Sequence, residues 1–281
     1  MLVTPCMFQA QLKLLKNLFT IMPLSEWIER RNSNAPLPKF TCAITFDDGW
    51  LDNFEFAFPI LQQEQGPATL FAVSHMVGTR EQFWPNRVAR LIATHPNWQQ
   101  HSALDWIRKI SGNGTPGVSE RDALGHIIAQ LKRMPDIEIK ERLDQSEKSL
   151  NMTPEQTPAL VDWDQLRIMQ NSGLMEIGSH TCHHFRLNAH LPPALAEREI
   201  VHSKALLEQQ LNLPVRLFCY PNGDATPHAI RLVKQHYVGA VTTQRGINST
   251  KTAAHKLLRI GIHQDISDTA LKFKARLSGW I

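Results

Sequence analysis

Short apolar segments recur along the chain and alternate with amphipathic ones. The apolar segments cover residues 40–46, 68–73, 175–178, 215–220, 238–243 and 257–263. Continuous apolar runs of this length are typical of strands buried on both faces of a parallel sheet. Helical patterns lie between several of them, at 164–173, 195–211 and 227–236. Strands that alternate with helices predict an α/β fold around a parallel sheet.

Two parts of the chain depart from this alternation. Residues 5–31 have the pattern helix, short strand, helix, and a loop rich in Asn, Ser and Pro follows them. Farther along, helical patterns dominate at 88–92, 103–110 and 123–134, and a turn-rich stretch at 111–117 interrupts them. We therefore predict four parts, namely an N-terminal extension (1–38), a barrel (39–265), a helical insert within it (80–160) and a C-terminal helix (266–281).

The composition narrows the class of protein. With 42% hydrophobic and 20% charged residues among 281, the chain can bury a sizeable core. The net charge of +4 is not gathered in a basic block, which argues against nucleic-acid binding. No run of about 18 apolar residues occurs, so we expect no transmembrane segment. The N-terminus lacks a secretory signal pattern, so a cytoplasmic location is expected unless an upstream segment is missing.

Polar residues directly follow three of the predicted strands. Asp47 and Asp48 end the first, His180 and His184 follow a later one, and residues 220–223 end the next. The C-terminal strand ends of a parallel barrel share one face, where active sites form. Two imidazoles four residues apart plus a carboxylate suit a catalytic zinc or similar divalent metal with one position open for water. The other aspartate can face a different side and act as a base.

These segments resemble the polysaccharide deacetylases, the NodB-type catalytic domain of carbohydrate esterase family 4. Residues 45–49 (TFDDG) match the first signature of that family, 180–184 (HTCHH) match its H-[ST]-x-x-H motif, and 218–223 (FCYPNG) match its F-x-x-P-x-G motif. The resemblance extends over residues 5–265 and is weakest in the helical insert. It implies a distorted (β/α) barrel of about seven parallel strands.

The resemblance also implies a role for each site residue. Asp47 corresponds to the general base, and the metal ligands correspond to Asp48, His180 and His184. The backbone N–H of Asn222 corresponds to an oxyanion donor, with Tyr220 and Pro221 beside it at the substrate. The metal is expected to be zinc, with cobalt, nickel or manganese as alternatives, and the partner an N-acetylated saccharide.

Three family positions are not matched, one of them an aromatic residue that many members carry where Asn222 stands, and a nearby strand suggests replacements for the other two. Many members carry Arg where Cys219 stands, and that Arg pairs with the base aspartate. The late L-x-H motif, which supplies the general acid, is only loosely matched by residues 261–263 (GIH). In a strand over 257–263, alternation places Arg259 and His263 on one face. We therefore predict that Arg259 pairs with Asp47 and that His263 is the acid.

Other conspicuous side chains are assigned to packing. Cys182 is expected to be a small buried residue, and His183, between the two proposed ligands, to point away from them. The tryptophans of the insert, Trp84, Trp98 and Trp106, are expected to belong to its core.

Together these observations predict a metal-dependent hydrolase that removes N-acetyl groups from amino-sugar units of a poly- or oligosaccharide. Two alternatives stay open. A catalytically silent carbohydrate-binding protein could share the fold, although it would not need a base at Asp47. A non-haem iron oxygenase also uses two His and one carboxylate, and oxygen consumption coupled to a 2-oxo acid would identify it.

Overall fold

The structure is a computed structural model that describes residues 3–112 and 119–279. It divides into two compact units, which we call the barrel unit (Met1–Thr79 with Pro158–Ile281) and the helical unit (Arg80–Thr157). None of the helices in the described residues combines the length and the apolar character that crossing a bilayer requires. Most of the predicted turn-rich stretch at 111–117 lies outside the described residues.

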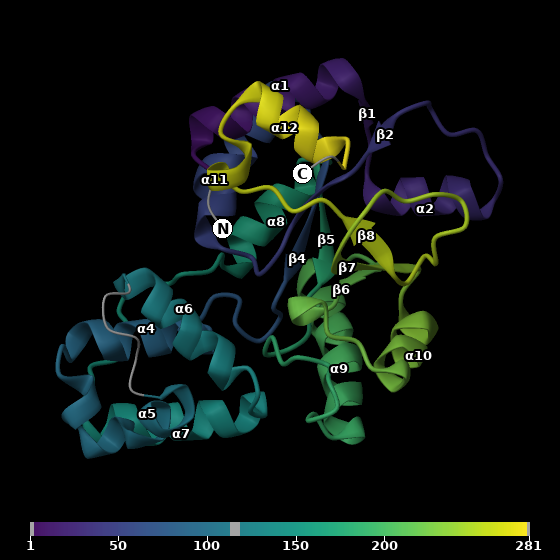
Figure 1. The fold of residues 1–281 in the computed structure, drawn as a ribbon. Coiled ribbons are helices and arrows are strands. Elements are labelled where there is room, and N and C mark those ends of the chain that lie inside the picture. The colour runs from purple at the N-terminus through teal and green to yellow at the C-terminus, as the bar shows by residue number, and fades with distance from the viewer. Residues whose placement is uncertain (1–2, 113–118, 280–281) are drawn as a thin grey trace. The chain divides into compact units, whose positions relative to one another are not determined.

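A curled parallel sheet forms the centre of the barrel unit (Figure 1). Its strands follow one another in space in chain order, from β3 (Ile44–Phe46), β4 (Ala68–Ala72) and β5 (Met175–Ser179) to β6 (Leu217–Cys219), β7 (Gly239–Arg245) and β8 (Leu257–Arg259). The predicted parallel α/β class and distorted barrel are confirmed, with six strands in the sheet. Because every pairing is parallel, all the strands end on the same side of the sheet.

Helices between the strands cover the sheet. They are α3 (Phe58–Glu64), α8 (Trp163–Asn171), α9 (Pro193–Leu211) and α10 (Pro227–His236). Helix α8 begins with a capping box, because Asp162 accepts the Gln165 N–H and Gln165 in turn accepts the Asp162 N–H. All five residues of β4 are buried, as expected of a central strand.

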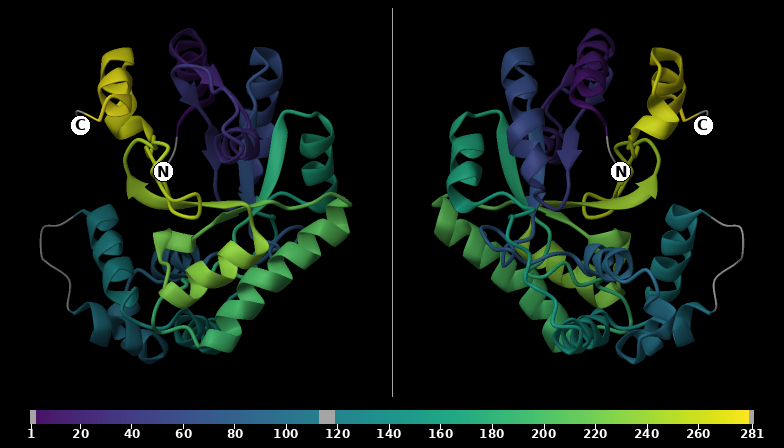
Figure 2. Two further views of the ribbon diagram at one scale, coloured as in Figure 1. Left: turned by 90° about the vertical axis from the view of Figure 1, so that its right-hand side faces the viewer. Right: turned by 90° about the vertical axis from the view of Figure 1, so that its left-hand side faces the viewer.

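The N-terminal segment contributes α1 (Pro5–Leu18), β1 (Thr20–Ile21) and α2 (Leu24–Asn32). Figure 2 shows α1 between α3 and α12 (Ala270–Leu277), and it contacts both. Helix α2 packs into the barrel core, where Leu24 and Ile28 join Phe71 and residues of β6, β7 and β8.

Two predicted strands differ from the structure. The apolar run at 40–46 is divided, because β2 (Thr41–Cys42) pairs with β1 and only β3 joins the main sheet. Strand β3 is half-buried instead of buried on both faces, since it lies at the edge of the sheet.

The strand predicted at 257–263 ends at Arg259. Its partner β7 ends at Arg245, which is paired with Arg259, so the following residues have no neighbouring strand in the described chain. Alternation therefore does not extend to His263, which instead immediately precedes the short helix α11 (Gln264–Ser267).

The helical unit has a core of its own. Its helices are α4 (Trp84–Thr94), α5 (Asp105–Ser111), α6 (Glu120–Leu131) and α7 (Asp136–Ser149). Trp98 is buried in this core, and Trp84 and Trp106 pack against it. The periodicity analysis does not predict α7, because Ile139 and Leu143 are its only buried apolar side chains.

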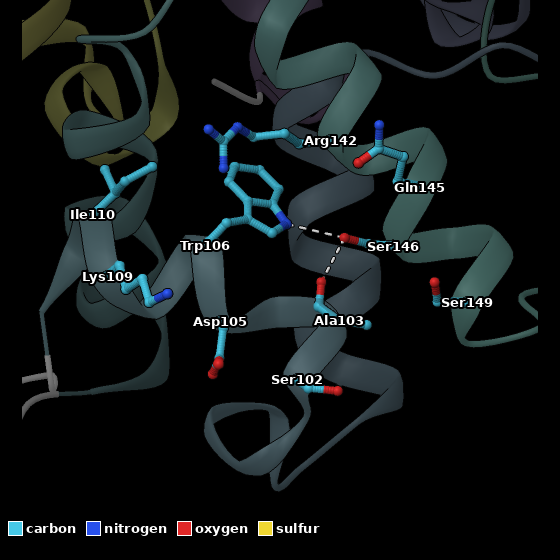
Figure 3. Close-up of a pocket in the computed structure, with 10 residues that line it drawn as sticks. All are labelled: Ser102, Ala103, Asp105, Trp106, Lys109, Ile110, Arg142, Gln145, Ser146 and Ser149. Carbon is cyan, nitrogen blue, oxygen red and sulfur yellow. Dashed lines mark hydrogen bonds between the residues drawn. The ribbon is translucent and has the colours of Figure 1, made fainter.

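Trp106 also lines a pocket between α5 and α7, shown in Figure 3. Its indole N–H donates to the Ser146 hydroxyl (2.9 Å), which donates to the Ala103 carbonyl oxygen (2.7 Å). The guanidinium of Arg142 lies 5.8 Å from the centre of the Trp106 ring. These contacts hold the ring in place, which agrees with the packing role expected for it.

Gly178 in β5 provides a test of this packing. A Cβ atom at this position would lie 2.5 Å from a ring carbon of Phe71, a fully buried side chain. We expect Gly178→Ala to lower the free energy of unfolding by about 1–3 kcal/mol, as overpacked cores do. Gly261→Ala is the control, because nothing lies within 4 Å of the Cβ it would add. Urea denaturation of both variants measures the difference, and equal stabilities would contradict the packing described.

Candidate functional site

Residues at the C-terminal strand ends meet on one side of the barrel unit. Asp47 and Asp48 directly follow β3, His180 directly follows β5, and Arg259 is the last residue of β8. His184 lies in the loop that leads from β5 towards α9. The structure thus brings together residues that are far apart in the sequence.

Asp48, His180 and His184 form a compact group, which we call the ligand trio. The Nε2 atoms of His180 and His184 each lie 3.4 Å from Oδ1 of Asp48. The other carboxylate oxygen of Asp48 accepts the indole N–H of Trp50 (2.9 Å). Burial alone would raise the pKa of Asp48, but the hydrogen bond from His180 and the charges of both histidines lower it to about 2. Asp48 is therefore a carboxylate at neutral pH.

The ligand trio fits a divalent metal ion. Ligand atoms about 2.0–2.1 Å from a tetrahedral zinc lie about 3.3 Å from one another, close to the separations observed here. Nδ1 of His180 lies 2.8 Å from the carbonyl oxygen of Cys219. A carbonyl oxygen only accepts hydrogen bonds, so Nδ1 carries a proton, and a metal at the trio would take the place of the Nε2 proton that here faces Asp48.

The loops that carry the trio adopt unusual backbone conformations. Asp48, Thr181 and His184 have positive φ angles of 74°, 68° and 61°. Non-glycine residues rarely adopt this region, and such positions concentrate at functional sites. For the β-branched Thr181 the conformation is costly, so the surrounding contacts must hold the loop in this shape.

Asp47 forms an ion pair with Arg259. Nη1 of Arg259 donates a hydrogen bond to Oδ1 of Asp47, and Nη2 donates one to Oδ2; both are 2.7 Å long. Nε of Arg259 donates to the carbonyl oxygen of Thr242 (2.8 Å), which fixes the guanidinium plane. Burial alone would raise the pKa of Asp47, but the charge and hydrogen bonds of Arg259 outweigh it and hold that pKa below its usual value.

Arg259 also occupies the space beside Cys219. Its Nη2 atom lies 3.5 Å from the sulfur of this buried residue. Arg259 additionally donates to the Thr45 hydroxyl of β3 (3.3 Å). Because β3 and β8 are the two edge strands of the sheet, this one side chain joins its opposite edges.

In the turn after β6, residues 220–223, two side chains are buried and Asn222 is exposed. The Tyr220 ring is fully buried and its hydroxyl donates to the carbonyl oxygen of His255 (3.1 Å), so the ring supports the turn from the core. Pro221 is buried as well, whereas Asn222 is exposed and has a positive φ of 57°. Gly223 is required at its position, because a Cβ there would lie 2.1 Å from the hydroxyl oxygen of Thr243.

His263 is not brought into this group. Its ring pairs with the carboxylate of Asp265. Within the part of the chain that the structure describes, no hydrogen bond or ion pair joins His263 to Asp47, Asp48 or Arg259.

Two residues that contact the site are not identified by the sequence analysis. The indole N–H of Trp50 donates to the carboxylate of Asp48. The position of Trp50 directly after the TFDDG segment could have identified it from the sequence. Glu199 of α9 binds the backbone N–H and the ring nitrogen Nδ1 of His183. Glu199 could have been identified from the sequence as the one charged residue on the face of α9 that also carries the buried residues Ala196, Ile200, Ser203 and Leu207.

Comparisons with known proteins agree with this geometry. The protein-family model described as polysaccharide deacetylase matches residues 34–241. Among curated proteins, none matches the sequence closely enough to count as a relative.

Several solved structures share the fold. The Streptococcus pyogenes deacetylase PplD in complex with acetate has a TM-score of 0.62 at 19% identity, over 94% of this chain and 84% of that one. IcaB from Ammonifex degensii has a TM-score of 0.62 at 18% identity, over 99% and 89% of the two chains. BC0361, a polysaccharide deacetylase from Bacillus cereus, has a TM-score of 0.59 at 18% identity, over 98% and 62%.

The ligand trio predicts which substitutions remove metal. We expect His180→Ala or His184→Ala to lower the zinc content of protein reloaded after chelation, because each removes one of three ligands. Asp47→Asn should keep the metal, because the side chain of Asp47 faces Arg259. Elemental analysis after dialysis measures zinc per chain. If Asp47→Asn loses the metal and Asp48→Asn keeps it, the roles of the two aspartates are exchanged.

Proposed function

This chain belongs to the polysaccharide deacetylase family, whose members are hydrolases that act on amide bonds, and we propose that it removes N-acetyl groups from amino-sugar units of a poly- or oligosaccharide. The observation that supports this most is the ligand trio with the Asp47–Arg259 ion pair beside it. Hydrolysis of an unactivated amide needs an activated water and a base, and these residues are suited to supply both.

The ligand trio would hold the metal. One carboxylate oxygen and two imidazole nitrogens suit zinc, and cobalt, nickel or manganese could replace it. A divalent cation held there would lower the pKa of its bound water, polarise the carbonyl of the amide and stabilise the negative charge that develops on the carbonyl oxygen. Trp50 and the Cys219 carbonyl oxygen keep two of the ligand side chains in orientation.

Asp47 would act as the general base. Its low pKa keeps it ionised at neutral pH, and each of its oxygens has a further lone pair beside the one that Arg259 occupies. In this role Asp47 takes a proton from the attacking water. Arg259 touches the base and not the reacting atoms, so we assign it a positioning role.

The oxyanion and the leaving amine need two further groups. We assign the first to the backbone N–H of Asn222, at the exposed turn that Tyr220 and Pro221 support from the core. His263 stays our candidate for the acid that protonates the departing amine, and His263→Ala tests it through the basic limb of the pH–rate profile.

Acetate release tests the proposed activity. We expect the protein to release acetate from N-acetylglucosamine oligomers or polymers, to lose this activity with a chelator, and to regain it with zinc. Asp47→Asn should lower the rate at least about 100-fold while the metal stays bound. Full activity in metal-free protein would contradict the proposal. Saccharide binding without acetate release by the zinc-loaded protein would instead favour the silent binding protein.

Arg259→Met tests the positioning role through pH. The base works as a carboxylate, so the rate falls when the pH drops through the pKa of Asp47. Burial raises the pKa of Asp47 and Arg259 lowers it, so removal of Arg259 should raise this pKa. We expect the acid limb of the pH–rate profile to move to higher pH by about one to three pH units.

Two further variants control this experiment. Arg245→Met removes an exposed arginine at the end of β7 and should leave the profile unchanged. Cys219→Arg combined with Arg259→Met should partly restore the profile, because Cys219 lies beside the guanidinium position. An unmoved acid limb in Arg259→Met would show that another group positions the base.

A further inference from the structure

Glu199 is a buried carboxylate directed at the loop that carries two of the proposed ligands. It lies on α9, and 1% of its side chain is exposed. Its two oxygens bind the same residue, since Oε2 accepts the backbone N–H of His183 (2.8 Å) and Oε1 lies 2.7 Å from Nδ1 of the His183 ring. Within the described residues, no Lys or Arg forms an ion pair with Glu199.

A carboxylate on the buried face of α9 is energetically costly, because it loses its hydration. Its neighbours on the buried face include Ala196 and Ile200, so an apolar side chain would avoid the desolvation of a charge. Charge-assisted hydrogen bonds to a backbone N–H and an imidazole offset that cost only while the His183 loop keeps its present shape. The side chain therefore favours one loop conformation over others.

The loop needs such support. Thr181 and His184 both have positive φ angles, and His183 lies between these two strained positions. The backbone N–H groups of Ser74 and His75 hold the first half of the loop through the carbonyl oxygens of Thr181 and Cys182. Glu199 holds the second half, at the residue directly before His184.

We propose that Glu199 is a positioning residue, which clamps His183 and so fixes the imidazole of His184 relative to His180 and Asp48. The inference rests on the proposed function in one respect, that the ligand trio binds a metal. It adds a residue outside the trio, more than one helical turn into α9, whose contribution is to the geometry of the site.

Cys182, His183 and Glu199 could instead be read as a second metal site, because their ligand atoms lie within 4.8 Å of one another. The contacts favour the clamp. The Oε1–Nδ1 separation of 2.7 Å is that of a hydrogen bond, whereas two ligands of one zinc lie about 3.3 Å apart. The remaining oxygen of Glu199 is already bound to a backbone N–H.

Two substitutions at Glu199 separate these interpretations. Glutamine keeps an oxygen for the His183 N–H and an amide that can donate to Nδ1, so Glu199→Gln should bind zinc within about threefold of the wild-type affinity. Alanine removes both bonds, and Glu199→Ala should weaken zinc binding about 10–100-fold, as the loss of groups that orient metal ligands does. Competition with a chromophoric chelator measures the affinity, and elemental analysis gives the zinc bound per chain.

Two further variants control for a general effect of substitution in α9 and for a failure of Glu199→Ala to fold. Glu197→Ala makes the same change at an exposed position of α9 and should leave zinc affinity unchanged. If Glu199→Ala does not fold, His183→Ala replaces it, because it keeps the backbone N–H bond to Glu199 and removes a side chain that is 35% exposed, with its ring contacts to His75 and Phe185. That variant should weaken zinc binding between twofold and tenfold, on the order of one lost orienting bond.

The outcomes distinguish this inference from the proposed function. Unchanged zinc affinity in folded Glu199→Ala, or in His183→Ala if that variant replaces it, would overturn the clamp. Two zinc ions per wild-type chain and one in Glu199→Gln would also overturn it, in favour of the second metal site. A wild-type protein that binds none of zinc, cobalt, nickel and manganese would overturn the proposed function on which the inference rests.

Discussion

Two consecutive carboxylates at the end of β3 must both be ionised, and the site is organised around this constraint. Burial raises the pKa of both carboxyl groups, and the charge of Asp48 raises that of Asp47 further. Each therefore has its own cationic or polar partners. Arg259 approaches Asp47 from β8, and His180, His184 and Trp50 surround Asp48. The separation of partners also separates the proposed roles, because Asp48 faces the two histidines whereas Asp47 faces Arg259.

The Arg259 ion pair has a chemical cost as well as a benefit. It keeps Asp47 in the form that accepts a proton, but a lower pKa makes any base intrinsically weaker. Such a base would be effective only if the water it deprotonates is acidified, as a cation at the neighbouring trio would do. In this arrangement the two halves of the site depend on each other, and neither would hydrolyse an amide efficiently alone.

The sequence analysis succeeds where structure is set locally. The residues at the ends of β3, β5 and β6 could be identified because parallel strands end on one face, and the motifs there are contiguous. Arg259 could be placed because it lies within a real strand. His263 could not, since β8 stops where its neighbour β7 stops, and strand length depends on that distant partner.

Other features escape a reading based on hydrophobic patterns. The division of residues 40–46 depends on pairing with β1, which local composition does not reveal. Helix α7 presents too few apolar residues to define a face. Glu199 lies on the buried face of α9, where its carboxylate binds His183. A pattern of hydrophobic and polar residues alone would place this glutamate on the exposed face. In each instance the deciding contact lies elsewhere in the chain.

The contact between the two edges of the sheet has a consequence for the order of assembly. Asp47 and Arg259 are 212 positions apart in the chain, so nearly the whole barrel unit must be in place before they meet. Contacts of such long range form late, because the intervening chain must first lose its conformational freedom. During synthesis, a nascent chain that has not reached β8 carries Asp47 without its guanidinium partner. The ion pair that holds the proposed base in place therefore forms only when the fold is nearly complete.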